Sequence, residues 1–123
     1  MATIELNDEN FEKTLADNDI VIIDFWAAWC GPCRSFAPVF EAASGRYSDI
    51  VFAKINTEAQ QGLAASFHIR SIPTLMVFRE RVILYAEAGA LPAAALEDLI
   101  AQARSVDMEQ VRAEIAAQEH KIQ

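Results

Sequence analysis

A chain of 123 residues is long enough for one domain, and its 53% hydrophobic and 23% charged residues exclude a disordered protein. The formal net charge of −8 disfavours nucleic acid and anionic membranes as partners, because both attract basic surfaces. Residues 1–6 lack the basic and apolar segments of a signal peptide, and no apolar run approaches the roughly 18 residues of a membrane-spanning helix. We therefore expect a cytoplasmic protein that binds neither nucleic acid nor membrane.

The first part of the chain combines a helix signal with a dense apolar run. Asn7 or Asp8 is placed to cap a helix that carries Phe11 and Leu15 on one face. Residues 20–26 are almost all β-branched or aromatic, and such continuous apolarity is typical of a strand that is covered on both faces. The sequence therefore predicts a buried strand soon after the first helix.

The following residues alternate strand and helix signals. We expect a helix from Cys30 to about Tyr47 with a kink at Pro38, which has no backbone N–H to donate. Apolar runs and turn signals then predict a strand over 50–55, a short helix over 57–67, a hairpin of strands 74–78 and 82–86, and a helix that starts at Pro92. This order predicts an α/β fold in which parallel crossovers come first and an antiparallel hairpin comes last.

Residues 105–123 are expected to form a helical extension of a domain that spans residues 1–104. Asp107 and Gln110 resemble a capping pair at the start of a helix. The apolar residues of this helix fall on one stripe: Met108, Val111, Ile115 and Ile122. Two interpretations remain open, because the helix can pack on its own domain or can bind a partner or a second copy of the chain.

The chain has two cysteines, Cys30 and Cys33, in one Cys-x-x-Cys segment. A disulfide that closes so short a loop stabilises a fold by only about 2 kcal/mol, so the pair suits a redox switch better than a structural crosslink. The alternative is half of a zinc site, but zinc needs four ligands and the rest of the chain offers only His68 and His120, which form no ligand pair. We therefore expect redox chemistry and no bound metal.

The spacing also predicts different roles for the two thiols. Neighbours at i and i+3 inside a helix have Cβ atoms about 5–6 Å apart, whereas a disulfide needs about 3.5–4.5 Å, so the pair suits a helix start. Gly31 permits the turn there, and Pro32 fits the first helical turn. Cys30 then faces unpaired amides, which favour its thiolate, while Cys33 lies deeper and less exposed. We expect Cys30 to attack a substrate disulfide and Cys33 to resolve the mixed disulfide.

Residues 24–33, Asp-Phe-Trp-Ala-Ala-Trp-Cys-Gly-Pro-Cys, resemble the active-site segment of the thioredoxin family. Pro38 matches the kinking proline of that family, residues 71–74 (Ser-Ile-Pro-Thr) resemble its cis-proline loop, and Gly89 resembles its substrate-groove glycine. The resemblance spans about residues 3–104. It implies a thioredoxin fold, whose central five-stranded mixed sheet has the order first, third, second, fourth and fifth strand, with the first three strands parallel and helices on both sides.

The resemblance also implies details of the site. It implies that the peptide bond before Pro73 is cis and that this proline faces the disulfide. It implies that Asp24 is a buried acid and base with a raised pKa that shuttles a proton for Cys33, and that Lys54 on the neighbouring strand tunes it. The alternatives are that Asp24 meets water at a strand end and that Lys54 is an ordinary surface lysine.

An apolar rim around Cys30 is expected to bind extended substrate backbone. The residues expected to contact the substrate are Trp29, Gly31, Pro32, Ile72, Pro73 and Gly89. Trp26 sits one turn behind this rim and is expected to be scaffold. His68 is expected in a helix C-cap or turn and His120 in solvent, and we expect neither to have a chemical role.

One segment inside the domain departs from the family pattern. Residues 79–81, Arg-Glu-Arg, join the last two strands where the family usually has a turn of the Asn-Gly type. Because no glycine is present to adopt a positive φ at low cost, we expect this hairpin turn to be rebuilt. The departure concerns the geometry of a loop and not the expected chemistry.

Three functions compete at this stage. The first is a monomeric protein disulfide reductase that binds no cofactor and receives electrons from NADPH through a thioredoxin reductase. The second is an oxidase or isomerase of this fold, which needs an oxidising compartment. Gly-Pro between the cysteines favours the first, because oxidases and isomerases of this fold more often have histidine there. The third is a holdase-like binding module without turnover, which has no need for both Cys30 and Cys33. We expect the reductase, with disulfide-containing proteins as substrates.

Overall fold

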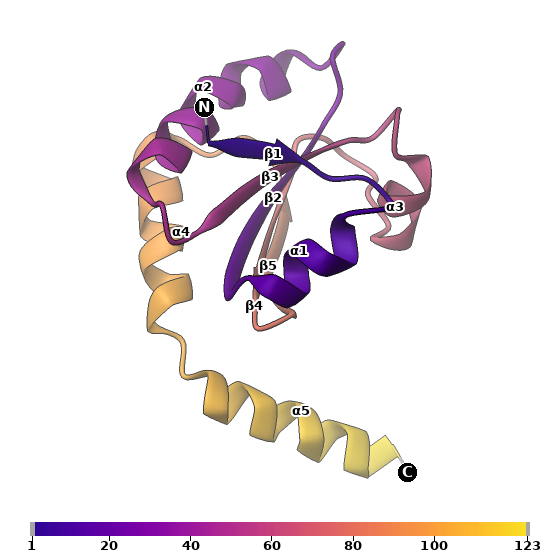
Figure 1. The fold of residues 1–123 in the computed structure, drawn as a ribbon, viewed down its shortest axis with the longest axis vertical. Coiled ribbons are helices and arrows are strands. Elements are labelled where there is room, and N and C mark those ends of the chain that lie inside the picture. The colour runs from indigo at the N-terminus through magenta and orange to yellow at the C-terminus, as the bar shows by residue number, and fades with distance from the viewer. Residues whose placement is uncertain (1, 123) are drawn as a thin grey trace.

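One sheet lies between helices, and a further helix follows at the C-terminal end (Figure 1). In this computed structural model the backbone is described for residues 2–122 and the side chains as far as His120. The elements in chain order are β1 (Thr3–Glu5), α1 (Phe11–Asp17), β2 (Ile20–Trp26), α2 (Gly31–Arg46), β3 (Val51–Asn56), α3 (Gln61–Ser66), β4 (Thr74–Arg79), β5 (Val82–Ala88), α4 (Ala93–Ser105) and α5 (Met108–Ile122).

The sheet has the strand order β1-β3-β2-β4-β5. β3 pairs in parallel with β1 and with β2, whereas β4 runs antiparallel to both β2 and β5. The predicted fold class, strand order and three parallel strands are therefore confirmed. β2 is the central strand, and six of its seven residues are buried, as its continuous apolarity predicted.

Alternate residues of β2 face two separate apolar layers. Ile20 and Ile22 pack with residues of α2 and α4, whereas Val21 and Ile23 pack with residues of α1 and α3 on the other face. Figure 1 shows α4 and α1 on opposite sides of the sheet. Since side chains two residues apart in a strand point to the same face, Asp24 lies on the face that α2 and α4 cover.

α1 begins later than its predicted cap. The side-chain oxygen of Asn7 accepts hydrogen bonds from the amides of Glu9 and Asn10, at 2.8 and 3.0 Å, and so holds a separate turn before the helix. Asn10 then occupies the N-cap position without a side-chain bond to the helix. An asparagine side chain that bonds the local backbone competes with helix formation, which explains the shift.

α3 also begins later than predicted, at Gln61 instead of residue 57. The side-chain oxygen of Asn56 accepts the amides of Glu58 and Ala59, at 2.9 and 3.2 Å, and forms a turn at the end of β3. The first residues of the predicted helix are therefore occupied by this turn, and only its second half is helical.

The turn between β4 and β5 is not rebuilt, contrary to the expectation. Glu80 and Arg81 are the two residues between the strands, and their φ angles are 53° and 67°. Positive φ at both positions belongs to the usual two-residue hairpin turn, which residues with a Cβ adopt at a cost of about 1–2 kcal/mol each. The two side chains form ion pairs with Arg112 and Glu12, respectively.

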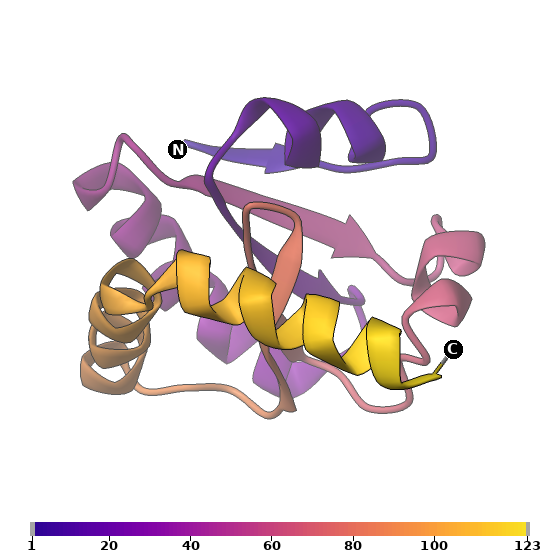
Figure 2. The same ribbon diagram turned by 90° about the horizontal axis from the view of Figure 1, so that it is seen from below.

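Among the described side chains of α5, those near its start pack on the domain. The amide of Gln110 donates to Asp107 Oδ1 at 3.2 Å, so the predicted N-cap forms, and Met108 is buried. Residues 113–120 are all exposed. In Figure 2, α5 crosses in front of the β4–β5 hairpin, and Figure 1 shows its second half clear of the other elements. Packing on its own domain is thus confirmed for the first turn, and Ile122 lies where no side chain is described.

Candidate active site

Cys30 lies where β2 leads into α2. Its backbone is extended (φ −85°, ψ 113°), so it is the N-cap of α2, and Gly31 and Pro32 are the first two helical residues. A disulfide joins Cys30 to Cys33, whose Cα atoms are 5.2 Å apart. The expected position of the pair at a helix start is therefore confirmed.

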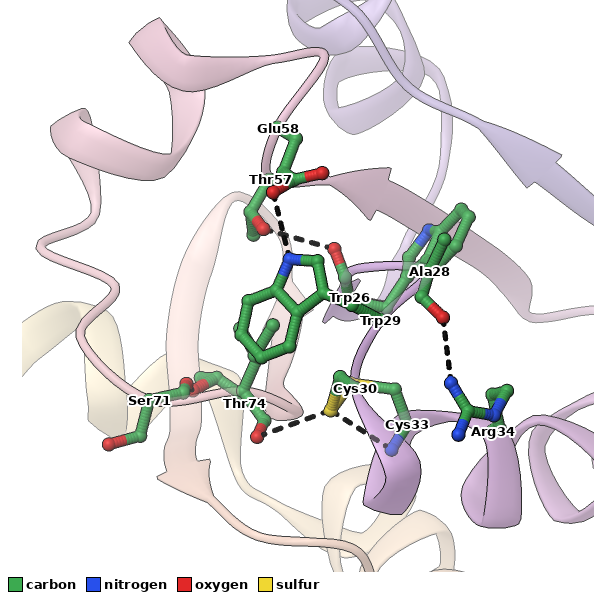
Figure 3. The surroundings of a disulfide bond; sticks show 11 residues. Trp26, Ala28, Trp29, Cys30, Cys33, Arg34, Thr57, Glu58, Ser71 and Thr74 are labelled. Atoms are coloured by element: carbon green, nitrogen blue, oxygen red, sulfur yellow. Dashed lines mark hydrogen bonds between the residues drawn. A yellow bond between two sulfur atoms is a disulfide. The ribbon is translucent and has the colours of Figure 1, made fainter.

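Two polar groups lie close to the sulfur of Cys30 (Figure 3). The amide N–H of Cys33 donates to Cys30 Sγ at 3.2 Å, and the carbonyl oxygen of Ile72 lies 3.6 Å from the same sulfur. The amide stabilises negative charge on the sulfur, which favours a thiolate once the disulfide is reduced. The carbonyl can accept the S–H of the neutral thiol. The site therefore holds a partner for each protonation state of a free Cys30.

The two sulfur-bearing residues do not differ in burial as expected. Cys30 is 4% exposed and Cys33 is 3% exposed. Both belong to a small apolar cluster with Ala27, against which Trp26 and Ile72 pack. The asymmetry of the pair lies instead in the amide that points at Cys30 Sγ, because an N-cap side chain faces the unpaired amides of the helix start.

The loop before β4 places Ile72 against the cysteine pair. The Ile72–Pro73 peptide bond is cis, as the resemblance implied. The carbonyl of Pro73 accepts the amide N–H of Gly89 at 2.8 Å, which ties the loop to the end of β5. Gly89 has φ 114°, a conformation that residues with a side chain rarely adopt, and this explains the glycine at that position.

Trp29 is the exposed apolar residue of the site. Its side chain is 65% exposed, and its indole Nε1 donates to Glu58 Oε2 at 2.8 Å (Figure 3). The residue before Trp29 is also bound: the carbonyl oxygen of Ala28 accepts a hydrogen bond from Arg34 Nη1 at 2.9 Å. Sequence reasoning missed Glu58 and Arg34, because an exposed charge in a turn or on a helix gives no signal of which distant group it contacts.

Asp24 is 1% exposed, and neither of its carboxylate oxygens has a hydrogen-bond partner in the described structure. Burial raises the pKa of Asp24 to about 6, and the positive charge of Lys54 opposes the rise. Lys54 is the residue of β3 that lies opposite Asp24 in the register of β2 and β3. Its Nζ lies 5.0 Å from the centre of the Trp26 ring. The alternative in which Asp24 meets water at a strand end is therefore wrong.

The two histidines lie where the sequence predicted. His68 follows α3 in a turn with φ 54°, and His120 is exposed near the end of α5. Within residues 2–122, no cluster of three or more His, Cys, Asp or Glu side chains could hold a metal ion. The same part of the chain has no helix both long and apolar enough to cross a membrane.

A five-stranded mixed sheet with a helix-start cysteine pair beside a cis-proline loop defines a thiol–disulfide oxidoreductase of the thioredoxin fold. The thioredoxin family model matches residues 2–102. The chain belongs to the thioredoxin family.

Individual relatives agree with this assignment. The chain is 55% identical over 118 residues to a Streptomyces coelicolor protein that carries the name thioredoxin 2, covering 96% of this chain and 88% of that protein. It is 37% identical over 101 residues to the thioredoxin of Haemophilus influenzae, covering 80% and 94%. A solved thioredoxin of Plasmodium falciparum superimposes with a TM-score of 0.75 at 32% identity, covering 81% of this chain and 97% of that one. The Streptomyces alignment takes in 118 of the 123 residues and therefore includes most of residues 105–123.

Proposed function

We propose that this protein is a disulfide reductase that keeps protein thiols reduced through Cys30 and Cys33. The observation that carries the proposal is the amide of Cys33, 3.2 Å from Cys30 Sγ at the start of α2, because it favours the nucleophilic thiolate. The exposed ring of Trp29 and the half-buried side chain of Ile72 lie beside Cys30 and offer apolar surface that suits a protein substrate (Figure 3).

The proposed exchange has two steps. The Cys30 thiolate attacks one sulfur of the substrate disulfide, forms a mixed disulfide, and displaces the other substrate sulfur, which takes up a proton. Cys33 then loses its proton and attacks Cys30 Sγ, which releases the second substrate thiol. The products are a dithiol substrate and the Cys30–Cys33 disulfide that the structure contains, so two electrons have passed to the substrate.

We propose that Asp24 accepts the proton that the Cys33 thiol loses. Asp24 lies on the face of β2 that α2 covers, and Cys33 is in the first turn of α2. Its pKa of about 6 makes this carboxylate a stronger base than an exposed one while leaving it mostly ionised at neutral pH. Lys54 acts on the exchange through Asp24, since its positive charge limits how far that pKa rises.

Substrate contacts are proposed at the rim of the disulfide. An extended substrate chain would lie over the cis-proline loop, with its reacting sulfur next to Cys30. The proposed contact residues are Trp29, Gly31, Pro32, Ile72, Pro73 and Gly89. The hydrogen bond from the Gly89 amide to the Pro73 carbonyl supports this assignment, because it holds two of the proposed contact residues next to one another.

Turnover needs a source of electrons for the oxidised pair. We propose a thioredoxin reductase that draws on NADPH, with no cofactor bound to this protein, and a monomer that works in the cytoplasm. Membership of the thioredoxin family supports the reductase as partner. A reducing compartment suits the function, since a protein that reduces disulfides must face a pool poised toward thiols.

Reduction of insulin, coupled to NADPH through a thioredoxin reductase, tests the proposed function. The wild-type protein should consume NADPH in proportion to the insulin disulfides reduced, and Cys30→Ser should abolish turnover. Arg81→Gln, on the hairpin turn far along β4 from the site, is the matched control and should retain full activity. Binding of insulin without turnover, unaffected by Cys30→Ser, would instead support the holdase-like module and contradict the reductase.

A further inference from the structure

Arg70 differs from the other arginines of the described structure in having no acceptor within the protein. The other six each bind a carboxylate or a backbone carbonyl: Arg34, Arg46, Arg79, Arg81, Arg104 and Arg112. An unpaired guanidinium is a ready donor for a carboxylate, because its fork of N–H groups matches the two oxygens. Arg70 is also exposed, so a group from outside the chain can reach it.

Arg70 borders an open groove of about 250 Å³ beside the cis-proline loop. His68 and Ser71 line the same groove, so a second basic side chain and a hydroxyl accompany the guanidinium. Ala86 and Ala88 of β5 also line it, and their small side chains leave it open. No described carboxylate lines this groove, since Glu87 points to the opposite face of the sheet from its two alanine neighbours.

The groove lies within reach of a substrate bound at Cys30. The carbonyl of Ile72 is 3.6 Å from Cys30 Sγ, and Arg70 precedes Ile72 by two residues. The Cα atoms of Arg70 and Ile72 are therefore at most about 7.6 Å apart. A substrate chain that advances about 3.3 Å per residue reaches Arg70 two or three residues from its reacting cysteine.

A negative charge lies at a different place on the rim. The indole of Trp29 holds the carboxylate of Glu58 at 2.8 Å. Figure 3 shows Glu58 and Ser71, which adjoins Arg70 in the chain, well apart around Cys30. The exposed Arg34, also near the disulfide, is bound to the carbonyl of Ala28, whereas Arg70 has no acceptor in the described structure. The charges of Glu58 and Arg70 therefore lie in different directions from Cys30, so the surface can distinguish the two orientations of a charged substrate segment.

We propose that this groove is a subsite for an acidic side chain of the substrate, two or three residues to one side of the attacked cysteine, with Arg70 as the carboxylate donor. The inference rests on the proposed reductase function and deepens it by naming a substrate class. The net charge of −8 repels acidic proteins at long range, so the subsite selects the local sequence around a cysteine and does not attract acidic proteins as a whole.

Two isomeric peptides test the proposal. In the first peptide, two glutamates precede the cysteine and two lysines follow it, with a single glycine on each side of the cysteine. In the second peptide, the glutamates and lysines change places. In both, the cysteine forms a mixed disulfide with 2-mercaptoethanol. Both peptides have the same net charge, so long-range repulsion is equal. Pre-reduced protein is mixed with each peptide, quenched with acid and analysed by chromatography. We expect one isomer to react about two- to fivefold faster, the range for an exposed ion pair, and the difference to shrink at high salt.

Variants connect this preference to the groove. Arg70→Gln should reduce the ratio of the two rate constants and Arg70→Glu should reverse it, whereas the control Arg81→Gln should keep the wild-type ratio. Equal rate constants for the two isomers would overturn the subsite, and so would a ratio that Arg70→Gln leaves unchanged. In either case, reduction of the neutral hydroxyethyl disulfide would still support the reductase function. Failure of the wild-type protein to reduce hydroxyethyl disulfide would overturn the reductase function and the subsite with it.

Discussion

Asp24 places a carboxyl group where the fold provides no hydrogen-bond donor for it. The neutral isostere asparagine would fill nearly the same volume without a charge to desolvate. The same burial that makes the ionised group unfavourable raises its pKa to about 6, and so makes it a better proton acceptor. A single residue thereby links the stability of the fold to the proposed chemistry at Cys33.

The proposed proton transfer predicts a pH-dependent defect in Asp24→Asn. At pH 7 the variant should reduce insulin about 100-fold more slowly, the lower end of the range for loss of a general base, because Cys33 loses its buried proton acceptor. Below pH 5 wild type and variant should converge, since Asp24 is then protonated in both the resting and the reacting protein. The exposed Asp8→Asn is the control and should match wild type. Equal rates at pH 7 would contradict the proton-shuttle role.

The raised pKa of Asp24 also predicts how stability depends on pH. The folded pKa of about 6 lies above the ordinary value of 3.8, so between these values the native state binds the proton more tightly than the unfolded chain. The protonation of Asp24 makes its full contribution to the free energy of unfolding below about pH 4. This contribution, about 3 kcal/mol in total, is lost as the pH rises through 6. Urea unfolding of the oxidised protein should therefore show Asp24→Asn more stable than wild type at pH 8, with the difference much smaller at pH 4. A pH-independent difference would exclude the buried charge as its cause.

Single residues differ in how far the sequence could locate them. Cys30 and Asp24 stand out because a Cys-x-x-Cys pair and a carboxylate inside an apolar strand are unusual locally. Glu58 and Arg70 look like any exposed charge, and their positions depend on loops that only the folded chain brings to the rim. Contacts between exposed side chains of different elements therefore had to come from the structure.

At the scale of elements, the β4–β5 hairpin keeps its turn in spite of unsuitable residues. The antiparallel register continues to the pair Arg79 and Val82, which leaves two residues to reverse the chain. Two-residue connections with both φ positive match the twist of the strands, so the sheet imposes this backbone on Glu80 and Arg81. The departure from an Asn-Gly turn therefore costs stability and leaves the topology unchanged.

Arg81→Gly should stabilise the protein by about 0.5–1 kcal/mol in thermal unfolding. Glycine adopts the positive φ of this position without steric cost, which outweighs its larger entropy when unfolded. Arg81→Ala is the matched control, because it loses the same ion pair with Glu12 and retains the Cβ. The account requires Arg81→Gly to exceed Arg81→Ala in melting temperature, and equal values would show that the backbone conformation is not the cause.

Helix starts show the same limit of local patterns. The apolar faces of α1 and α3 were predicted, but asparagines just before them bind the local backbone and delay each helix. Whether such a side chain caps a helix or a turn depends on small differences in backbone angles that residue type does not determine. By contrast, the buried strand β2 was predictable, because six of its seven residues are β-branched or aromatic.

At the scale of the whole molecule, α5 follows the part of the chain that the thioredoxin family model matches. The thioredoxin model ends at residue 102, and the burial of Met108 and the pair of Arg112 with Glu80 hold the start of α5 on that domain. Residues 113–120 are exposed and so gain little tertiary support, and a helix of this length is marginal in water by itself. We propose residues 105–123 as a separate extension, whose described part is docked on the domain at the start of α5 and exposed over residues 113–120.

Truncation separates the two halves of α5. A chain that ends at Arg112 should unfold within about 0.5 kcal/mol of the full chain, because residues 113–120 bury little surface. A chain that ends at Arg104 should lose about 2–3 kcal/mol, because the burial of Met108 is removed, as is the hydrogen bond from Arg79 to the carbonyl of Val106. Light scattering should give a monomer mass for all three chains. A larger mass for the full chain alone would assign the free half of α5 to a second copy.

The unequal roles of the two cysteines are the centre of this account, and trapping the mixed disulfide tests them most directly. Reduced Cys33→Ser and reduced Cys30→Ser are each mixed with a protein disulfide substrate and analysed by intact mass spectrometry without reductant. The account predicts a stable covalent adduct through Cys30 in Cys33→Ser, because attack is intact and resolution is absent, and little adduct in Cys30→Ser. Equal adducts in both variants, or an adduct formed mainly through Cys33, would contradict it.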